Sequence, residues 1–160
     1  MTKVETHNGT SYQTNAEMVY NGLGQRLAMT ASQAGLFLTS QYVLDGNALL
    51  AATANGQSTY YLTGLAEFQA AWAYYLPDGQ QSVRQVTNAS GLVILNRRFT
   101  PWGEVYSQDG STHQTFGYLG GVLDAANGLI YVGNGQYYDP ATGRFLSRGV
   151  NPVSTNPYVP

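Results

Sequence analysis

Cysteine is absent from this chain, and charged residues are scarce. The lack of cysteine excludes disulfide bridges, thiolate metal ligands and a cysteine nucleophile. Asp, Glu, Lys and Arg together make up 10% of the 160 residues, whereas soluble domains commonly contain about a quarter. Because the net charge is −2 and no basic run is longer than Arg97-Arg98, we expect no nucleic-acid partner.

Long apolar runs are also missing. Residues 1–15 lack the apolar segment of a signal peptide, and no later run is long enough to predict a membrane span. We therefore expect that export, where it occurs, depends on an upstream segment or on a dedicated export machine.

The chain is instead rich in glycine, tyrosine and turn signals, with 19 Gly and 13 Tyr. Apolar and polar residues alternate over 36–43 and 92–99, and residues 129–132 form a short apolar run. Between such runs, Asn-Gly or Asp-Gly pairs predict hairpin turns, because these residues tolerate positive φ. The sequence therefore predicts an all-β fold of successive antiparallel hairpins. The pairs lie at 8–9, 21–22, 45–46, 55–56, 78–79, 109–110, 127–128 and 134–135.

A loose repeat underlies these hairpins. Each unit has an apolar strand end, a polar turn with glycine and then the start of another apolar strand. We align its glycines at positions 24, 46, 79 and 103. Since one unit cannot bury its own apolar face, neighbouring units must pack side by side. The units cover residues 20–27, 44–49, 75–79 and 99–105.

Residues 62–76 fit two secondary structures. Their apolar residues lie near helical spacing from Leu62 to Leu76, yet every second residue from Phe68 to Leu76 is apolar, as on one face of a strand. We interpret the segment as strand, because Asp78-Gly79 predicts a hairpin turn directly after it.

The most distinctive string is GQYYDPATGRFLSR, at residues 135–148. Its aromatic pair favours an extended backbone, its Asp-Pro starts a turn, its second glycine permits positive φ, and a strand resumes afterwards. We assign this turn a structural role, with no part in catalysis or cofactor binding. The residues concerned are Tyr137, Tyr138, Asp139, Pro140, Gly143, Arg144, Phe145 and Leu146.

This string resembles the closing segment of the core associated with Rhs repeats, also called YD repeats, of bacterial polymorphic toxins and the teneurin-like YD shell. The resemblance is strongest from about Ala73 to Pro152, and residues 1–72 fit only as degenerate YD units. We therefore divide the chain into repeat hairpins at 1–72 and a core segment at 73–160, within one continuous β structure. Further matches follow in order at 74–79, 82–84, 87–91, 99–105 and 123–131.

The resemblance implies that the hairpins wind into a spiral sheet, which closes as a hollow shell around a C-terminal toxin domain. On this basis the chain is a non-enzymatic shell segment that encapsulates or delivers a toxin in interbacterial competition or host interaction. Its partners would be the remainder of the shell and the cargo. The full-length parent would be secreted or at the cell surface, and we expect this chain to be a fragment of it.

A self-cleaving aspartyl protease core is a further, disfavoured alternative. In many family members the closing motif continues as Ser-Arg-Asp-Pro, and this aspartate is implicated in self-cleavage together with a second carboxylate. Here Gly149 replaces that aspartate, and the chain ends at Pro160 before a second one occurs. Two neighbouring carboxylates are needed for this chemistry. We therefore expect Arg144 to order the turn and not to serve cleavage.

No other residues predict a catalytic, cofactor or metal site. His7 and His113 lie far apart among polar turn residues, without other ligands at metal spacing. Asp139 precedes proline in a turn, and residues 22–24 lack the strand–helix context of a dinucleotide fingerprint. No base accompanies the serines in a nucleophile motif; those considered are Ser82, Ser90 and Ser147.

The tyrosines leave a binding function open. Exposed aromatic rings flanked by Asn, Gln and Asp can stack on sugars, so a secreted or cell-surface glycan-binding YD module is the second hypothesis. The simpler interpretation is that these rings pack between neighbouring hairpins.

Overall fold

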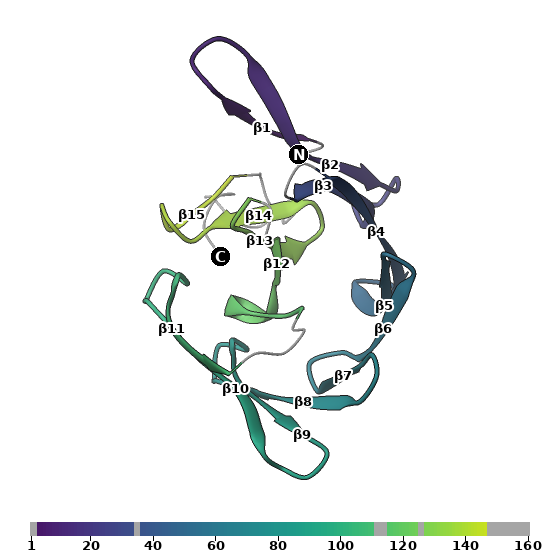
Figure 1. Cartoon of the computed structure of the whole chain (residues 1–160), viewed down its shortest axis with the longest axis vertical. Coiled ribbons are helices and arrows are strands. Elements are labelled where there is room, and N and C mark those ends of the chain that lie inside the picture. Colours follow the sequence, from purple (N-terminus) through teal and green to yellow (C-terminus); the bar gives the residue numbers. More distant parts are fainter. Residues whose placement is uncertain (1–2, 34–35, 111–114, 125–126, 147–160) are drawn as a thin grey trace.

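The computed structural model describes residues 3–33, 36–110, 115–124 and 127–146. Its first sheet, here called the wall, has eleven strands in sequence order, each antiparallel to the next. Figure 1 shows that the wall curves around the remaining strands. The wall strands are β1 (Lys3–His7), β2 (Tyr12–Tyr20), β3 (Arg26–Gln33), β4 (Leu36–Asp45), β5 (Ala48–Ala54), β6 (Gln57–Leu62), β7 (Ala66–Phe68), β8 (Trp72–Pro77), β9 (Val83–Asn88), β10 (Val93–Phe99) and β11 (Val105–Gly110).

A second sheet of four antiparallel strands, here called the inner sheet, lies on the concave side of the wall (Figure 1). A short 3-10 helix, η1 (Tyr118–Gly120), precedes it. The predicted all-β hairpin fold is thus confirmed, although the sequence did not predict the separation into two sheets. The inner strands are β12 (Val122–Asp124), β13 (Leu129–Gly133), β14 (Gln136–Asp139) and β15 (Arg144–Phe145).

The predicted strands at 36–43, 92–99 and 129–132 are confirmed by β4, β10 and β13. Residues 62–76 contain strands and no helix, as interpreted, but they do not form one strand. A turn separates β7 from β8, and Phe68 is the antiparallel partner of Trp72 across that hairpin. The alternation in the sequence arises because Phe68 of β7 lies on the same outer face as Trp72 and Tyr74 of β8, whereas Tyr75 is buried on the other face.

Seven of the eight predicted Asn-Gly or Asp-Gly turns lie at hairpin connections. At 55–56 and 134–135 both residues have positive φ, as a type I′ turn requires. The prediction at 109–110 is wrong, because Asp109 and Gly110 belong to β11 and pair with Asn96 and Leu95. Glycine is needed there for close approach, since a Cβ atom would lie 2.2 Å from the Ile94 carbonyl oxygen.

Four hairpins of the wall have the same type of turn, and this recurring turn revises the predicted repeat. In each turn, the side-chain oxygen of the first residue accepts a hydrogen bond from the backbone N–H of the fifth residue, at 3.0–3.1 Å. The fourth residue of each turn has positive φ. Gly79 and Gly46 are therefore misaligned, since Gln81 takes the positive-φ place and the turn at Gly46 is shorter. The first residues of the four turns are Asn21, Asp78, Asn88 and Thr100.

Asp78 has a second role, because its Oδ2 accepts a hydrogen bond from Arg84 Nε at 2.7 Å. Burial acts to raise the pKa of Asp78, but hydrogen bonds from Arg84, Gln80 and Ser82 outweigh it and lower the pKa below its ordinary value. The contribution of Asp78 to stability is therefore present above the unfolded pKa near 4 and lost as the pH falls through the folded pKa.

We expect Asp78→Ala to destabilise the chain by about 1–2 kcal/mol, because two backbone N–H groups and Arg84 lose their acceptor. Asp78→Asn should cost only about 0.5 kcal/mol, because Asn caps the same turn at 21 and 88 and only the partly exposed ion pair is lost. Urea unfolding at neutral pH and below pH ~4 measures both effects, and the cost of Asp78→Asn should vanish in acid. Equal costs for the two variants would contradict the shared-turn interpretation.

Three apolar clusters form the core, and each of them joins the wall to the segment inside it. The first cluster places Leu129 and Tyr137 against Met18 and Met29 of the wall. The second lies under β8 to β10 with Phe116, and the third gathers Phe99 with aromatic residues of the inner sheet. The concave face of the wall is thus buried by the C-terminal part of the chain.

Candidate functional site

The residues that fasten the inner strands to the wall form the candidate site, here called the joint. At its centre Arg26 of β3 donates from Nη1 to Oδ2 of Asp124 of β12, at 2.7 Å. Both side chains are 2% exposed. The guanidinium also lies over the ring of Tyr131, 4.3 Å from its centroid, and over that of Tyr42, at 4.9 Å. Burial opposes the charge of Arg26, but the Asp124 carboxylate outweighs burial and raises the pKa of the guanidinium, so this group stays charged.

Tyrosine hydroxyls extend this ion pair into a network. Arg26 Nη1 also donates to Tyr137 Oη at 3.1 Å, and the hydroxyls of Tyr20 and Tyr137 lie 2.8 Å apart. The Arg26 backbone N–H donates to Tyr131 Oη at 3.3 Å. Tyr137, the first residue of the predicted turn motif, is fully buried here. It thus belongs to the contact between the two sheets.

Burial raises the pKa of six tyrosines, and that of Tyr61 reaches about 12. In the unfolded chain tyrosine ionises near pH 10, so above ~10 the unfolded state releases protons that the folded state retains. We expect stability to fall as the pH rises above ~10, because these tyrosines ionise at a higher pH in the folded chain than in the unfolded chain. Tyrosinate absorbance recorded with circular dichroism tests this. Ionisation of all tyrosines near pH 10 with a native spectrum would contradict it. The six are Tyr20, Tyr42, Tyr61, Tyr75, Tyr137 and Tyr138.

A second contact joins the stretch before η1 to the middle of the wall. The hydroxyls of Tyr61 and Thr115 lie 2.7 Å apart, and the Phe116 ring meets the Tyr61 ring edge-on at 5.4 Å. Ser82 is fully buried, and its Oγ accepts the Leu119 N–H at 3.0 Å. Ser82, for which the sequence offers no catalytic partner, therefore has a structural role.

A third contact lies at the turn after β10. Tyr118 Oη donates to the Pro101 carbonyl at 2.7 Å, and Tyr138 Oη donates to the Trp102 carbonyl at 2.8 Å. The two tyrosine rings stack at 5.8 Å. Gly103 lies directly against the Tyr118 ring. Tyr118 of η1 and Tyr138 of β14 thus hold one wall turn through its backbone.

The remaining motif residues build the turn that closes the inner sheet. Asp139 Oδ1 accepts the Ala141 N–H at 2.9 Å, and its carbonyl accepts the Gly143 N–H at 2.8 Å. Gly143 has φ +66° and faces the Trp102 ring. Pro140 is buried, whereas Arg144 is exposed and pairs with Asp139 across the two strands. The Phe145 ring meets the Tyr138 ring edge-on, with 5.3 Å between their centroids. The Leu146 N–H donates to the Tyr137 carbonyl at 2.8 Å. That Arg144 orders the turn stays a prediction.

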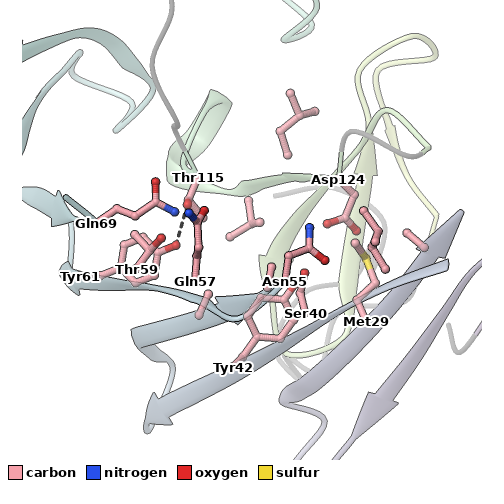
Figure 2. A pocket seen from close by; sticks show the side chains of 16 residues that line it. Met29, Ser40, Tyr42, Asn55, Gln57, Thr59, Tyr61, Gln69, Thr115 and Asp124 are labelled. Carbon is pink, nitrogen blue, oxygen red and sulfur yellow. Dashed lines mark hydrogen bonds between the residues drawn. The ribbon is translucent and has the colours of Figure 1, made fainter. Parts of the chain in front are cut away.

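A pocket of about 430 Å³ lies between the wall and residues 115–124, the stretch that leads through η1 into β12. Figure 2 shows Asp124 and Met29 at one end and Gln69 and Tyr61 at the other, with uncharged polar side chains between them. The carboxylate of Asp124 is already bound by Arg26. The pocket therefore offers hydrogen-bonding groups but no paired acid and base.

The other candidate residues do not assemble into a site. His7 lies on β1, exposed, with its ring 4.8 Å from that of Tyr12, whereas His113, Ser147 and Gly149 lie outside the described residues. Among the residues that the structure describes, no group of three or more His, Cys, Asp or Glu could hold a metal ion. Within the same ranges, no helix has the length and apolar character required to cross a membrane.

Sequence reasoning missed Arg26 and Asp124. Arg26 stood only as a member of the unit at 20–27, and Asp124 only within the match at 123–131. The available signal was the low charge content, because an isolated arginine or aspartate at the start or end of an apolar strand in such a chain needs a partner when it is buried.

A curved wall of sequential hairpins, with the C-terminal strands folded into its concave side, defines the class of YD-repeat shell segments. The family model described as Teneurin YD-shell matches residues 11–157. The chain belongs to the Teneurin YD-shell family, which confirms the resemblance to Rhs/YD-repeat proteins. No curated protein sequence matches the chain.

Solved structures share this fold. The crystal structure of TcdB2-TccC3-Cdc42 matches with a TM-score of 0.71 and 20% identity, over 98% of this chain and 9% of the other. The Tc holotoxin pore of Photorhabdus luminescens, with a mutation in TccC3, matches with a TM-score of 0.73 and 19% identity, over 98% of this chain and 8% of the other. The chain thus spans less than a tenth of the length of the chains it resembles.

Proposed function

We propose that this chain is a non-enzymatic segment of a YD shell that encloses a toxin cargo, and that the inner sheet closes the shell at this end. The joint is the observation that carries the proposal. Its charged and hydroxyl groups bond one another across the two sheets and so serve cohesion. The pocket beside them lacks a paired acid and base.

The partners in this proposal are the remainder of the shell and a toxin domain, and the parent protein is secreted or at the cell surface. The toxin context of the similar structures supports this, since one of them is a holotoxin pore. We retain the division into repeat hairpins at 1–72 and a core segment at 73–160 as part of the proposal, together with a structural role for the motif residues 137–146.

Limited proteolysis of the complete gene product tests enclosure. We expect the cargo domain to resist a protease that digests the same domain when it is expressed alone. Asp124→Ala, which leaves Arg26 buried without its partner, should expose the cargo, whereas Glu17→Gln on the exposed Lys3–Glu17 pair should not. Digestion of the cargo at the same rate inside and outside the parent would overturn the proposal. Intact-mass measurement of the same protein should show no specific self-cut.

A further inference from the structure

Arg97 is a buried cation on the concave face of β10, near the end of the wall. It is 8% exposed, and Leu95 and Phe99, its neighbours on the same face of the strand, are buried on either side of it. Leu95 belongs to the second apolar cluster and Phe99 to the third. The fold thus places a charged side chain between two apolar clusters, where a charge without a partner is costly.

No carboxylate of the described residues pairs with Arg97. All nine Asp and Glu residues of the sequence lie within the described ranges, and each ion pair that they form joins another basic residue. Within the same ranges, the side chain of Arg97 makes one hydrogen bond, from Nε to Gln108 Oε1 of β11 at 3.0 Å. Burial lowers the pKa of Arg97 without an acid to oppose it, whereas Asp124 reverses this effect at Arg26.

The guanidinium lies between the last wall strands and the stretch before η1. A Cβ atom added to Gly117 in that stretch would lie 3.7 Å from Arg97 Nη1. On the other side β11 is the last strand of the wall (Figure 1), and within the described residues it pairs with β10 alone. All six residues of β11 are exposed or half-buried. The concave side of the wall next to Arg97 is therefore accessible to another part of the protein.

The surroundings of Arg97 suit a single carboxylate. Its Nη groups can donate to the two oxygens of a carboxylate, which neutralises the buried charge one for one. Nucleic acids and other polyanions are recognised through clustered cations, which this face lacks. Arg98 is exposed on the opposite face of β10, and Arg84 is already bound by Asp78.

We propose that Arg97 binds the carboxylate of an Asp or Glu side chain of the enclosed cargo domain. This inference rests on the proposed function, in which the concave side of the wall faces the interior of the shell. The carboxylates of the chain itself pair elsewhere or stay apart from Arg97. The chain also covers only 9% and 8% of the similar chains, so the partner belongs to a much longer protein.

Carbodiimide cross-linking of the complete gene product with Arg97→Lys tests this contact. The reagent joins the introduced amine to a carboxylate that touches it, and mass spectrometry of the digested protein identifies the acid. We expect a link between position 97 and an Asp or Glu of the cargo domain. Arg98→Lys is the matched control, because it introduces the same amine one residue away on the opposite, exposed face, and it should give no link to the cargo.

Arg97→Met provides a second test that does not depend on access of the reagent. In the 160-residue chain alone it should raise the midpoint of thermal unfolding by about 2–4 °C, because it removes a buried charge that has no acid partner there. In the complete gene product it should speed proteolysis of the cargo several-fold, because a carboxylate of the cargo loses its partner. Arg98→Met should change neither measurement.

The outcomes separate this inference from the proposed function. Cargo that is digested at the same rate inside and outside the wild-type parent would remove the proposed function. Cargo that is protected in the wild type, with neither a link from position 97 nor faster digestion in Arg97→Met, would overturn the Arg97 contact alone. A link to an acid of the shell would also overturn it, as would a lower unfolding midpoint of Arg97→Met in the chain alone, because either result would place the partner of Arg97 within the shell.

Discussion

Replacement of Arg26 by methionine is expected to destabilise the chain by about 3–5 kcal/mol, the usual cost of breaking a buried ion pair from one side. The variant leaves the Asp124 carboxylate buried without its partner and removes a donor from Tyr137. It also removes the cation held over the rings of Tyr42 and Tyr131. Urea unfolding followed by circular dichroism measures the change in the free energy of unfolding.

A second variant separates the loss of the partner from the loss of packing. Arg26→Met combined with Asp124→Leu removes both charges of the pair, so it should recover most of the stability. Glu17→Gln breaks the exposed pair with Lys3 and should change the unfolding free energy by less than about 1 kcal/mol. If Arg26→Met also costs less than about 1 kcal/mol, the pair does not hold the two sheets together.

Gly103→Ala is expected to cost about 2–5 kcal/mol, because backbone strain and a clash with a packed ring add together. Gly103 has φ +94°, and a Cβ atom built there would lie 2.4 Å from Cδ1 of Tyr118. The left-handed backbone costs an alanine about 1–2 kcal/mol. The contact with the ring adds about 1–3 kcal/mol, because Tyr118 must leave its place between Phe99 and Tyr138.

Gly91→Ala is the matched control for Gly103→Ala. Gly91 occupies the equivalent, fourth position of the turn that starts at Asn88, with φ +78°. A Cβ atom there would meet no atom within 4 Å. It should therefore cost only the backbone strain, about 1–2 kcal/mol. The difference between the two variants in urea unfolding measures how firmly Tyr118 packs against the wall. Equal costs would contradict the third contact of the joint.

The local features of the fold could be predicted from the sequence because local chemistry determines them. Asn-Gly at 55–56 and 134–135 adopts the positive φ angles that its residue types favour. Alternation over 36–43 matches β4, in which alternate residues face the concave side. Asp139 caps its own turn, as expected for Asp before Pro.

The inner sheet could not be predicted, because its position depends on partners far apart in the chain. Arg26 and Asp124 are separated by 98 positions, and no local pattern relates them. Nor does the spacing of glycines reveal which residue of a turn takes positive φ. Gln81 does so where Gly79 was expected, because the side chain of Asp78 organises the backbone from the first position of the turn.

An electron cryo-microscopy map of the complete gene product tests most directly that this chain closes one end of a YD shell. We expect further hairpins paired to the outer edge of β1, a hollow interior enclosed by them, and the inner sheet within the curve of β2 to β10. A compact particle in which the edge of β1 has no neighbouring strand, or in which β12 to β15 lie outside the wall, would contradict the account.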